Sequence, residues 1–132
     1  MHVPGVERFA SGGPWEVRFG YSRAVRAGDL LLVAGTTAIE EDGVVRGIGD
    51  AGAQTAFVLD RIDAAPAAAG ARMDQVVQTR MNITDASHAE EIGRAHEERY
   101  GKRPSASAMV AVAARGDRVR GHGGAIACEP QR

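Results

Sequence analysis

The order of apolar and polar residues along the chain predicts alternating strands and helices. Residues 22–25 are short and extended, and a turn at Gly28 and Asp29 separates them from residues 30–39. This second segment, LLLVAGTTAI, is too apolar and too rich in β-branched residues for a surface strand, so we predict a central strand. Gly35 lies inside it, and a glycine within a strand marks a bulge or the close approach of a ligand or another backbone.

Helical periodicity follows a polar, glycine-rich stretch over residues 40–49, which predicts a loop. Asp50 can cap a helix over residues 51–69, and Gly70 lies where a left-handed C-terminal residue belongs. Apolar residues three or four positions apart define one face of this helix: Val58, Ile62, Ala65 and Ala69. Pro66 conflicts with the helix, because an interior proline costs about 3 kcal/mol, so we expect the last turn to be bent or displaced.

The second half of the chain repeats the pattern of strand and helix. Residues 76–84 alternate, which predicts a strand whose buried face carries Val77, Thr79, Met81 and Ile83. Ser87 and Glu90 form an S-x-x-E capping box that opens a second helix, which ends at Gly101. The apolar face of this helix consists of Ala89, Ile92, His96 and Tyr100. A break at residues 103–104 precedes a strand over 108–114, and only residues 125–128 could form a last strand.

Two helices and one sheet are typical of an α+β fold in which the helices cover one face of the sheet. The other face is apolar and has nothing to cover it, so we expect another subunit to bury it. The chain has 132 residues. We expect one domain over residues 1–132, since domains have roughly 100–200 residues.

Composition and charge exclude several classes of function. The formal net charge is −1 and aromatic residues make up 5% of the chain, which argues against nucleic-acid binding. The longest apolar run, residues 30–35, is far below the roughly 20 residues of a membrane span, and the N-terminus resembles no signal peptide. Cys128 is the only cysteine, so an internal disulfide is excluded. We therefore expect a cytoplasmic protein with neither nucleic-acid nor membrane partners.

The chain carries no motif for a metal, a phosphate or an activated serine. His88 and His96 are eight residues apart, which is not the spacing of a helical metal pair. A glycine-rich phosphate loop and a G-x-S-x-G turn are both absent from the sequence. We expect no metal and no cofactor.

A set of short motifs, in order along the chain, resembles one known family. The pieces are Tyr21-Ser22-Arg23-Ala24-Val25, Leu31-Leu32-Val33-Ala34-Gly35-Thr36, Gln54 with Val58-Leu59, Ala68-Ala69-Gly70-Ala71, Val76-Val77 with Thr84-Asp85, Tyr100-Gly101 and Arg103-Pro104-Ser105. No single piece is specific. The ordered set over residues 21–112 is similar to the RidA/YjgF family, also called the reactive intermediate deaminase or endoribonuclease L-PSP family, whereas residues 115–132 are atypical of it.

The resemblance implies a chorismate-mutase-like α+β fold with one mixed sheet. It also implies a homotrimer whose sheets form a central barrel, with three small-molecule clefts between subunits. In better-known members the cleft hydrolyses enamines and imines to a 2-oxo acid and ammonia. An arginine in a P-A-R-[ST] motif holds the substrate carboxylate there, and a glutamate in a C-terminal V-x-I-E-A strand positions or activates water.

Neither of these two residues has a counterpart here. The arginine position falls on Ala106, or on Ser107 if one residue is inserted, and neither offers the planar fork that holds a carboxylate. The glutamate position falls on Gly124, two residues after His122. The segment over residues 115–124 is glycine-rich and does not fit an apolar barrel strand.

The resemblance places Tyr21, Gly35 and Thr36 in the cleft. Tyr21 would orient substrate or water, and the alternative is an interface aromatic residue. Gly35 would let a ligand approach the backbone and Thr36 would supply a hydroxyl, and the alternative is a bulge with a buried threonine. Ala106, Ser107 and Met109 complete the candidate binding residues.

Each of three further residues has two possible roles. Arg80 is a charge in a half-buried strand, and it either grips an anion in place of the missing arginine or pairs with an acid at a subunit edge. His122 is either a general base or exposed to solvent. His96, on a packed helix face, is more often a core residue than a catalyst.

Two functions fit the sequence. One is a RidA-like enzyme that acts on an imine, an enamine or a related carbonyl-derived metabolite, with doubtful activity on 2-imino acids. The other is a non-catalytic trimer that binds a metabolite or a partner in the same cleft. An acid–base group in the cleft favours the enzyme, whereas a dry cleft lined by Met81, Met109 and Val110 favours the binder.

Overall fold

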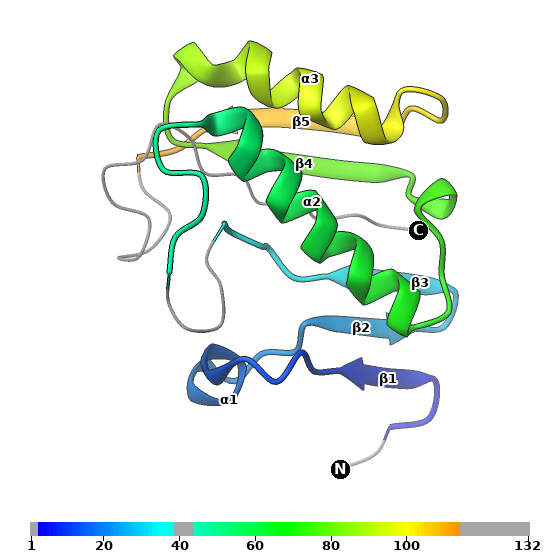
Figure 1. The fold of residues 1–132 in the computed structure, drawn as a ribbon. Coiled ribbons are helices and arrows are strands. Elements are labelled where there is room, and N and C mark those ends of the chain that lie inside the picture. Colours follow the sequence, from blue (N-terminus) through cyan, green and yellow to red (C-terminus); the bar gives the residue numbers. More distant parts are fainter. Residues whose placement is uncertain (1–2, 39–43, 114–132) are drawn as a thin grey trace.

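The computed structural model describes residues 3–38 and 44–113 (Figure 1). These residues form five strands and three α-helices with two short 3-10 helices. In chain order they are β1 (Val6–Phe9), α1 (Pro14–Phe19), β2 (Ala24–Ala27), β3 (Leu30–Val33), α2 (Ala51–Ala68), η1 (Met73–Gln75), β4 (Gln78–Ile83), η2 (Ala86–His88), α3 (Ala89–Tyr100) and β5 (Ala106–Ala111). The sequence pattern predicts neither β1 nor α1. Helix α1 forms because Pro14 suits a first helical position and Gly20 ends the helix in the left-handed region, with φ of 72°.

Strands β1, β2 and β3 form an antiparallel sheet with β2 in the middle. The predicted turn is confirmed: Gly28, with φ of +60°, and Asp29 connect β2 to β3 as a two-residue hairpin. The prediction of a central strand over residues 30–39 is wrong in two respects. The strand ends at Val33, and in the described part of the chain β3 lies at the edge of its sheet. After Val33, the carbonyl of Gly35 and the hydroxyl of Thr36 accept hydrogen bonds from Arg23 instead of pairing with another strand.

Helix α2 follows the prediction closely. The side chain of Asp50 accepts a hydrogen bond from the backbone N–H of Ala53 at 2.9 Å, which caps the helix. All four residues of the predicted apolar face are buried. Pro66 lies within the helix, which continues to Ala68, and Gly70 adopts a left-handed φ of +79°. The proline lies in the last turn, and its carbonyl accepts hydrogen bonds from the backbone N–H groups of Ala69 and Ala71.

Strands β4 and β5 pair in parallel. The predicted alternation along β4 is confirmed for Thr79, Met81 and Ile83, which are buried, but Val77 precedes the strand and is exposed. Strand β5 begins two residues before the predicted 108–114 segment and ends at Ala111. Strand β5 starts before the predicted segment because Ala106 already pairs with Gln78 of β4.

Helix α3 runs to Tyr100 and has Gly101 as its C-cap, which agrees with the predicted end at Gly101, and it buries Ile92 and Tyr100. The predicted capping box is wrong. Asp85 accepts hydrogen bonds from the N–H and the hydroxyl of Ser87, at 2.9 and 2.7 Å, and so caps η2. The hydroxyl of Ser87 is thereby committed to Asp85, and α3 begins after His88 without a side-chain cap.

The α+β class is confirmed, and helix α2 packs against both α3 and β3. The expectation of one mixed sheet is not met by the described residues, because no backbone ladder joins the three-stranded and two-stranded sheets. The core consists of Ala24, Leu31, Val33, Ala38, Ala51, Val58, Leu59, Ile62, Ala65, Ala69, Val76, Met81, Ile83, Ile92 and Tyr100. The glycine-rich segment over residues 115–124, which does not fit a barrel strand, and the possible last strand over 125–128 lie outside the described residues.

One face of the antiparallel sheet carries apolar side chains away from the core. Leu30 pairs with Ala27 and Leu32 pairs with Val25, so the register places all four on the same face. Leu30 is 48% exposed and Leu32 is 41% exposed. We call these four residues the uncovered face. None of the described helices is both long and apolar enough to span a membrane.

Candidate functional site

Arg23 connects the start of β2 to the segment that follows β3. Its Nη1 donates to the hydroxyl of Thr36 and its Nη2 donates to the carbonyl of Gly35, both at 2.9 Å. The backbone N–H of Ala34 donates to the carbonyl of Arg23 at 2.9 Å. Because β2 and β3 are antiparallel, these residues meet at one end of the sheet. We call Arg23, Gly35 and Thr36 the Arg23 cluster.

The hydroxyl of Thr36 has no proton left for a ligand. It donates to the carbonyl of Ala34 at 3.2 Å and accepts from Arg23, and the residue is only 3% exposed. A hydroxyl has one donor hydrogen, so the internal bond uses it. Gly35 directly precedes Thr36, and Tyr21, which is 44% exposed, lies two residues before Arg23.

Two charged residues flank the Arg23 cluster. Glu16 is buried, and its carboxylate accepts hydrogen bonds from the backbone N–H of Ser11, at 3.0 Å, and from the Ser11 hydroxyl. Burial lowers the pKa of Arg23, an effect that Tyr21 and Glu16 oppose and Arg61 reinforces. The guanidinium stays protonated, since arginine titrates far above neutral pH.

Sequence reasoning does not identify Arg23 or Glu16 as site residues. Arg23 stands inside the Tyr21–Val25 motif, and its charge beside two cleft residues is a usable signal. Glu16 offers no such signal, because its burial follows from a short helix that the hydrophobic pattern does not reveal.

A second polar cluster lies where β4 and β5 begin. The hydroxyl of Thr79 is 2.8 Å from Nε2 of His96 and 2.9 Å from the hydroxyl of Ser105, and it donates to the hydroxyl of Ser107 at 3.1 Å. Burial lowers the pKa of His96, and the His96 ring packs against Tyr100 with centroids 4.6 Å apart. His96 therefore serves as a packed, hydrogen-bonded residue within the described fold.

Arg80 and Ala106 share the opposite face of the two-stranded sheet. Ala106 pairs with Gln78 and Ala108 pairs with Arg80, so these four side chains lie on one face, whereas Ser107 lies on the other. Arg80 and Ala106 are both exposed. Among residues 3–38 and 44–113, Arg80 has no hydrogen-bond or ion-pair partner.

The small side chains of Ala106 and Ala108 leave space for this guanidinium along β5. Two strand residues span roughly 6–7 Å, which is within the reach of an arginine side chain. Met109, another candidate, is half-buried and packs against the core. His122 lies outside the described residues.

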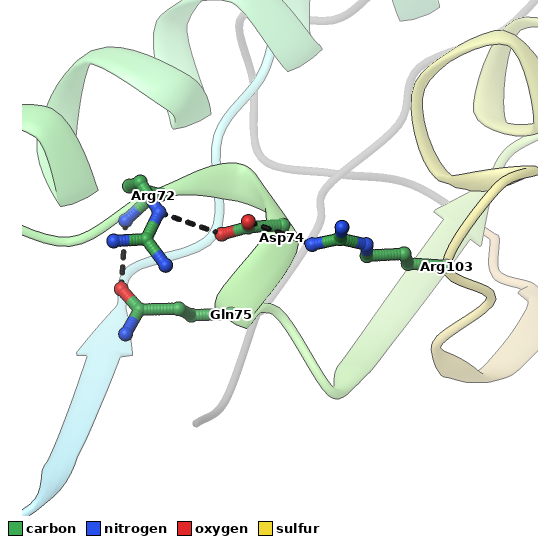
Figure 2. A network of polar contacts seen from close by, with 4 residues as sticks. All are labelled: Arg72, Asp74, Gln75 and Arg103. Atoms are coloured by element: carbon green, nitrogen blue, oxygen red, sulfur yellow. Dashed lines mark hydrogen bonds and ion pairs between the residues drawn. The ribbon is translucent and has the colours of Figure 1, made fainter.

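An ion network joins η1 to the loop before β5, as Figure 2 shows. Asp74 of η1 binds Nε of Arg72 at 3.0 Å and Nη1 of Arg103 at 2.7 Å, and Gln75 accepts from the backbone N–H of Arg72 at 2.9 Å. Desolvation acts to raise the pKa of Asp74, but the bonds and charges of the two arginines lower it below its usual value. The network ties the chain that enters β4 to the loop that enters β5.

The two halves of the candidate site lie at opposite ends of the domain. In Figure 1 the chain leaves β3 at the end where α2 begins, whereas β4 starts at the end where α2 finishes. Within one chain, the Arg23 cluster and the β4–β5 residues therefore do not meet. No group of three or more histidine, cysteine, aspartate or glutamate side chains suited to a metal occurs within 3–38 and 44–113.

Comparison with known proteins agrees with the fold. The endoribonuclease L-PSP family model matches residues 15–120. An uncharacterized protein of Streptomyces coelicolor is 38% identical over 111 residues, which cover 83% of this chain and 82% of the relative. The structure of Rv2704 from Mycobacterium tuberculosis, a member of the YjgF/YER057c/UK114 family, is 36% identical and superposes with a TM-score of 0.81. That match covers 96% of this chain and 97% of Rv2704.

A more distant structure shares the fold. RidA from the Antarctic bacterium Psychrobacter is 23% identical, with a TM-score of 0.74 and coverage of 98% of each chain. The family match, the related sequence and the similar structures lead to one conclusion: this chain belongs to the RidA/YjgF/YER057c/UK114 family, which is also described as endoribonuclease L-PSP.

Proposed function

We propose that this protein is a RidA-type small-molecule enzyme. It acts on an imine, an enamine or a related carbonyl-derived metabolite in a cleft between two copies of the chain, which assemble as a homotrimer. The observation that carries this proposal is the separation of the site into two halves at opposite ends of one chain. A second copy is needed to bring the Tyr21 end of one chain against the β4–β5 end of the next.

The uncovered face supports the assembly. Leu30 and Leu32 remain partly exposed together with Val25 and Ala27, on the side of the sheet opposite the core. Contiguous apolar surface of this kind is typical of protein interfaces. Burial against a neighbouring copy removes this surface from water.

The Tyr21 end supplies groups for hydrolysis. The phenol of Tyr21 is exposed and orients the substrate or the attacking water. Gly35 has no side chain and lets a planar C=N group approach the backbone. The backbone N–H of Tyr21 donates to the backbone carbonyl of Glu16 at 3.0 Å, which fixes the start of the Tyr21 segment against helix α1. Water adds to the C=N carbon, a proton moves to nitrogen, and ammonia leaves as the carbonyl forms.

The β4–β5 end sets the limits on substrate choice. Ala106 has no guanidinium for a carboxylate next to the reacting carbon, so hydrolysis of 2-imino acids is slow. Arg80 is the one candidate cation on the same face as Ala106 in the described part of β4 and β5. It offers a partial substitute with a different geometry.

An ammonia-release assay tests the proposal. Purified protein is added to 2-aminoacrylate generated in situ, with a family member that carries the P-A-R-[ST] arginine as the positive control. Light scattering is run on the same sample. The proposal expects a trimer that releases ammonia faster than the spontaneous rate but much more slowly than the control. A monomer, or a trimer with no acceleration over the spontaneous rate, contradicts it.

A non-catalytic binder is the second candidate. The side chains of Thr36 and His96 are committed to internal hydrogen bonds, which favours a binding role over catalysis. A trimer that releases no ammonia and still binds 2-oxo acids supports this candidate.

A further inference from the structure

Arg23 presents part of its guanidinium to the outside of the Arg23 cluster. An arginine side chain has five N–H donors in a rigid fork. One hydrogen of Nη1 and one of Nη2 are used on Thr36 and Gly35. The second hydrogen on each of these nitrogens has no partner in the described part of the chain. The side chain is only half-buried, so a ligand can reach it.

The two internal bonds hold the guanidinium in place. Both acceptors belong to the segment after β3, and the backbone bond between Ala34 and Arg23 closes the same turn at 2.9 Å. A fixed guanidinium loses little conformational freedom when it binds a ligand. Thr36 cannot take this role, because its proton is bound to the carbonyl of Ala34.

We propose that Arg23 binds the anionic group of the ligand, a carboxylate, at the Tyr21 end of the cleft. This inference rests on the proposed function and names the residue and the charge that recognise the substrate. Arg23 directly precedes β2, whereas position 106 begins β5 at the other end of the fold. The carboxylate is therefore held from the opposite side of the cleft, and the ligand lies in a different orientation.

The surrounding charges are compatible with an anion. Burial lowers the pKa of Arg23, and the neighbouring Arg61 lowers it further, while Tyr21 and Glu16 raise it. Arg61 thus adds a second positive charge to the surroundings of Arg23. A bound carboxylate reduces the repulsion between the two arginines and forms charge-assisted hydrogen bonds to Arg23.

Binding measurements with paired probes test this assignment. The probes are pyruvate and 4-oxopentanoate, each compared with its uncharged amide, and the readout is the ratio of the two Kd values from ligand-detected NMR. Two acids of different length report how far the carboxylate lies from the carbonyl. The variants are Arg23→Gln, which removes the charge, and Arg23→Lys, which keeps it.

Arg26→Gln is the matched control. Arg26 lies in β2, which directly follows Arg23, and its Nη2 donates to the carbonyl of Ala69. Its Nε, like that of Arg23, is buried without a partner among the described residues. Both glutamine variants lose guanidinium bonds to backbone carbonyls, so thermal unfolding of each separates a loss of stability from a loss of recognition.

We expect the wild type to bind at least one acid about tenfold more tightly than its amide. Arg23→Gln makes acid and amide equal, Arg23→Lys keeps part of the preference, and Arg26→Gln keeps all of it. Three results overturn the inference: no preference for either acid in the wild type, a preference that survives Arg23→Gln, or a preference that Arg80→Ala abolishes and Arg23→Gln does not. Ammonia release without any acid preference leaves the proposed function standing and removes Arg23 from ligand recognition.

Discussion

The hydroxyl oxygen of Thr79 lies 2.8 Å from Nε2 of His96, which joins β4 to α3. Thr79 is 1% exposed, and its hydroxyl also contacts Ser105 and Ser107. The three contacts share one hydroxyl, which has a single proton to donate. One buried hydroxyl therefore connects helix α3, strand β4 and the loop before β5.

Removal of this hydroxyl is expected to destabilise the protein. Thr79→Val leaves three polar side chains without the hydroxyl that they share, so we predict a loss of about 1–3 kcal/mol in the free energy of unfolding. Thr79→Ser keeps the hydroxyl and retains most of the stability. Urea unfolding measures both, and Thr84→Val is the control, since the Thr84 hydroxyl is buried without a partner among the described residues. Equal losses in Thr79→Val and Thr84→Val contradict the role of the cluster.

The environment of His96 predicts a dependence of stability on pH. Burial lowers the pKa of His96 from its usual 6.5, so the unfolded chain takes up a proton at a higher pH than the folded chain does. Stability is complete above about 6.5 and falls as the pH drops through the lowered pKa. His96→Asn removes this contribution. Urea unfolding at successive pH values below neutrality should show a smaller loss for the variant than for the wild type, and parallel curves contradict the prediction.

Much of the fold could be predicted because local patterns determine it. The Asp50 cap, the apolar face of α2 and the alternation of Thr79, Met81 and Ile83 depend on residues close in sequence. The end of β3 could not be predicted, since it depends on Arg23, which is 12 and 13 residues away from its two acceptors. The predicted Ser87 cap was wrong for a local reason. Asp85 accepts hydrogen bonds from both the N–H and the hydroxyl of Ser87.

The candidate site could be predicted only in part. The resemblance led to Tyr21, Gly35 and Thr36, and the structure brings Gly35 and Thr36 onto Arg23. The pattern could not show that the Thr36 hydroxyl is used internally, because that depends on backbone geometry after β3. It also could not reveal Glu16, which is buried by a helix that has no apolar periodicity.

Asp74 predicts a salt-dependent contribution to stability. Its ion pairs with Arg72 and Arg103 hold the entry to β4 against the entry to β5 (Figure 2). Asp74→Asn should lower Tm at low ionic strength, and the difference from the wild type should shrink in about 1 M salt, where exposed charges are screened. Differential scanning calorimetry at both salt concentrations provides the measurement. A difference that is independent of salt contradicts an electrostatic origin.

The uncovered face predicts the site of assembly. Leu32→Arg places a charge on this face, and we expect the protein to shift from trimer to monomer while it retains its helical circular dichroism. Ile48→Arg is the control, because Ile48 is 65% exposed on the loop before α2 and outside the uncovered face. Light scattering measures the mass of each variant. A Leu32→Arg trimer as stable as the wild type contradicts assembly through this face.

The most direct test of the central claim restores the missing guanidinium. Ala106→Arg places it on the exposed face that Ala106 shares with Arg80, and Ala108→Arg adds the same group two residues further along the same face. Ammonia release from 2-aminoacrylate is measured for the wild type and both variants, each confirmed as a trimer. The account predicts slow release by the wild type, about tenfold faster release by Ala106→Arg, and no gain from Ala108→Arg. No release above the spontaneous rate by the wild type or by Ala106→Arg contradicts a RidA-type reaction at this site.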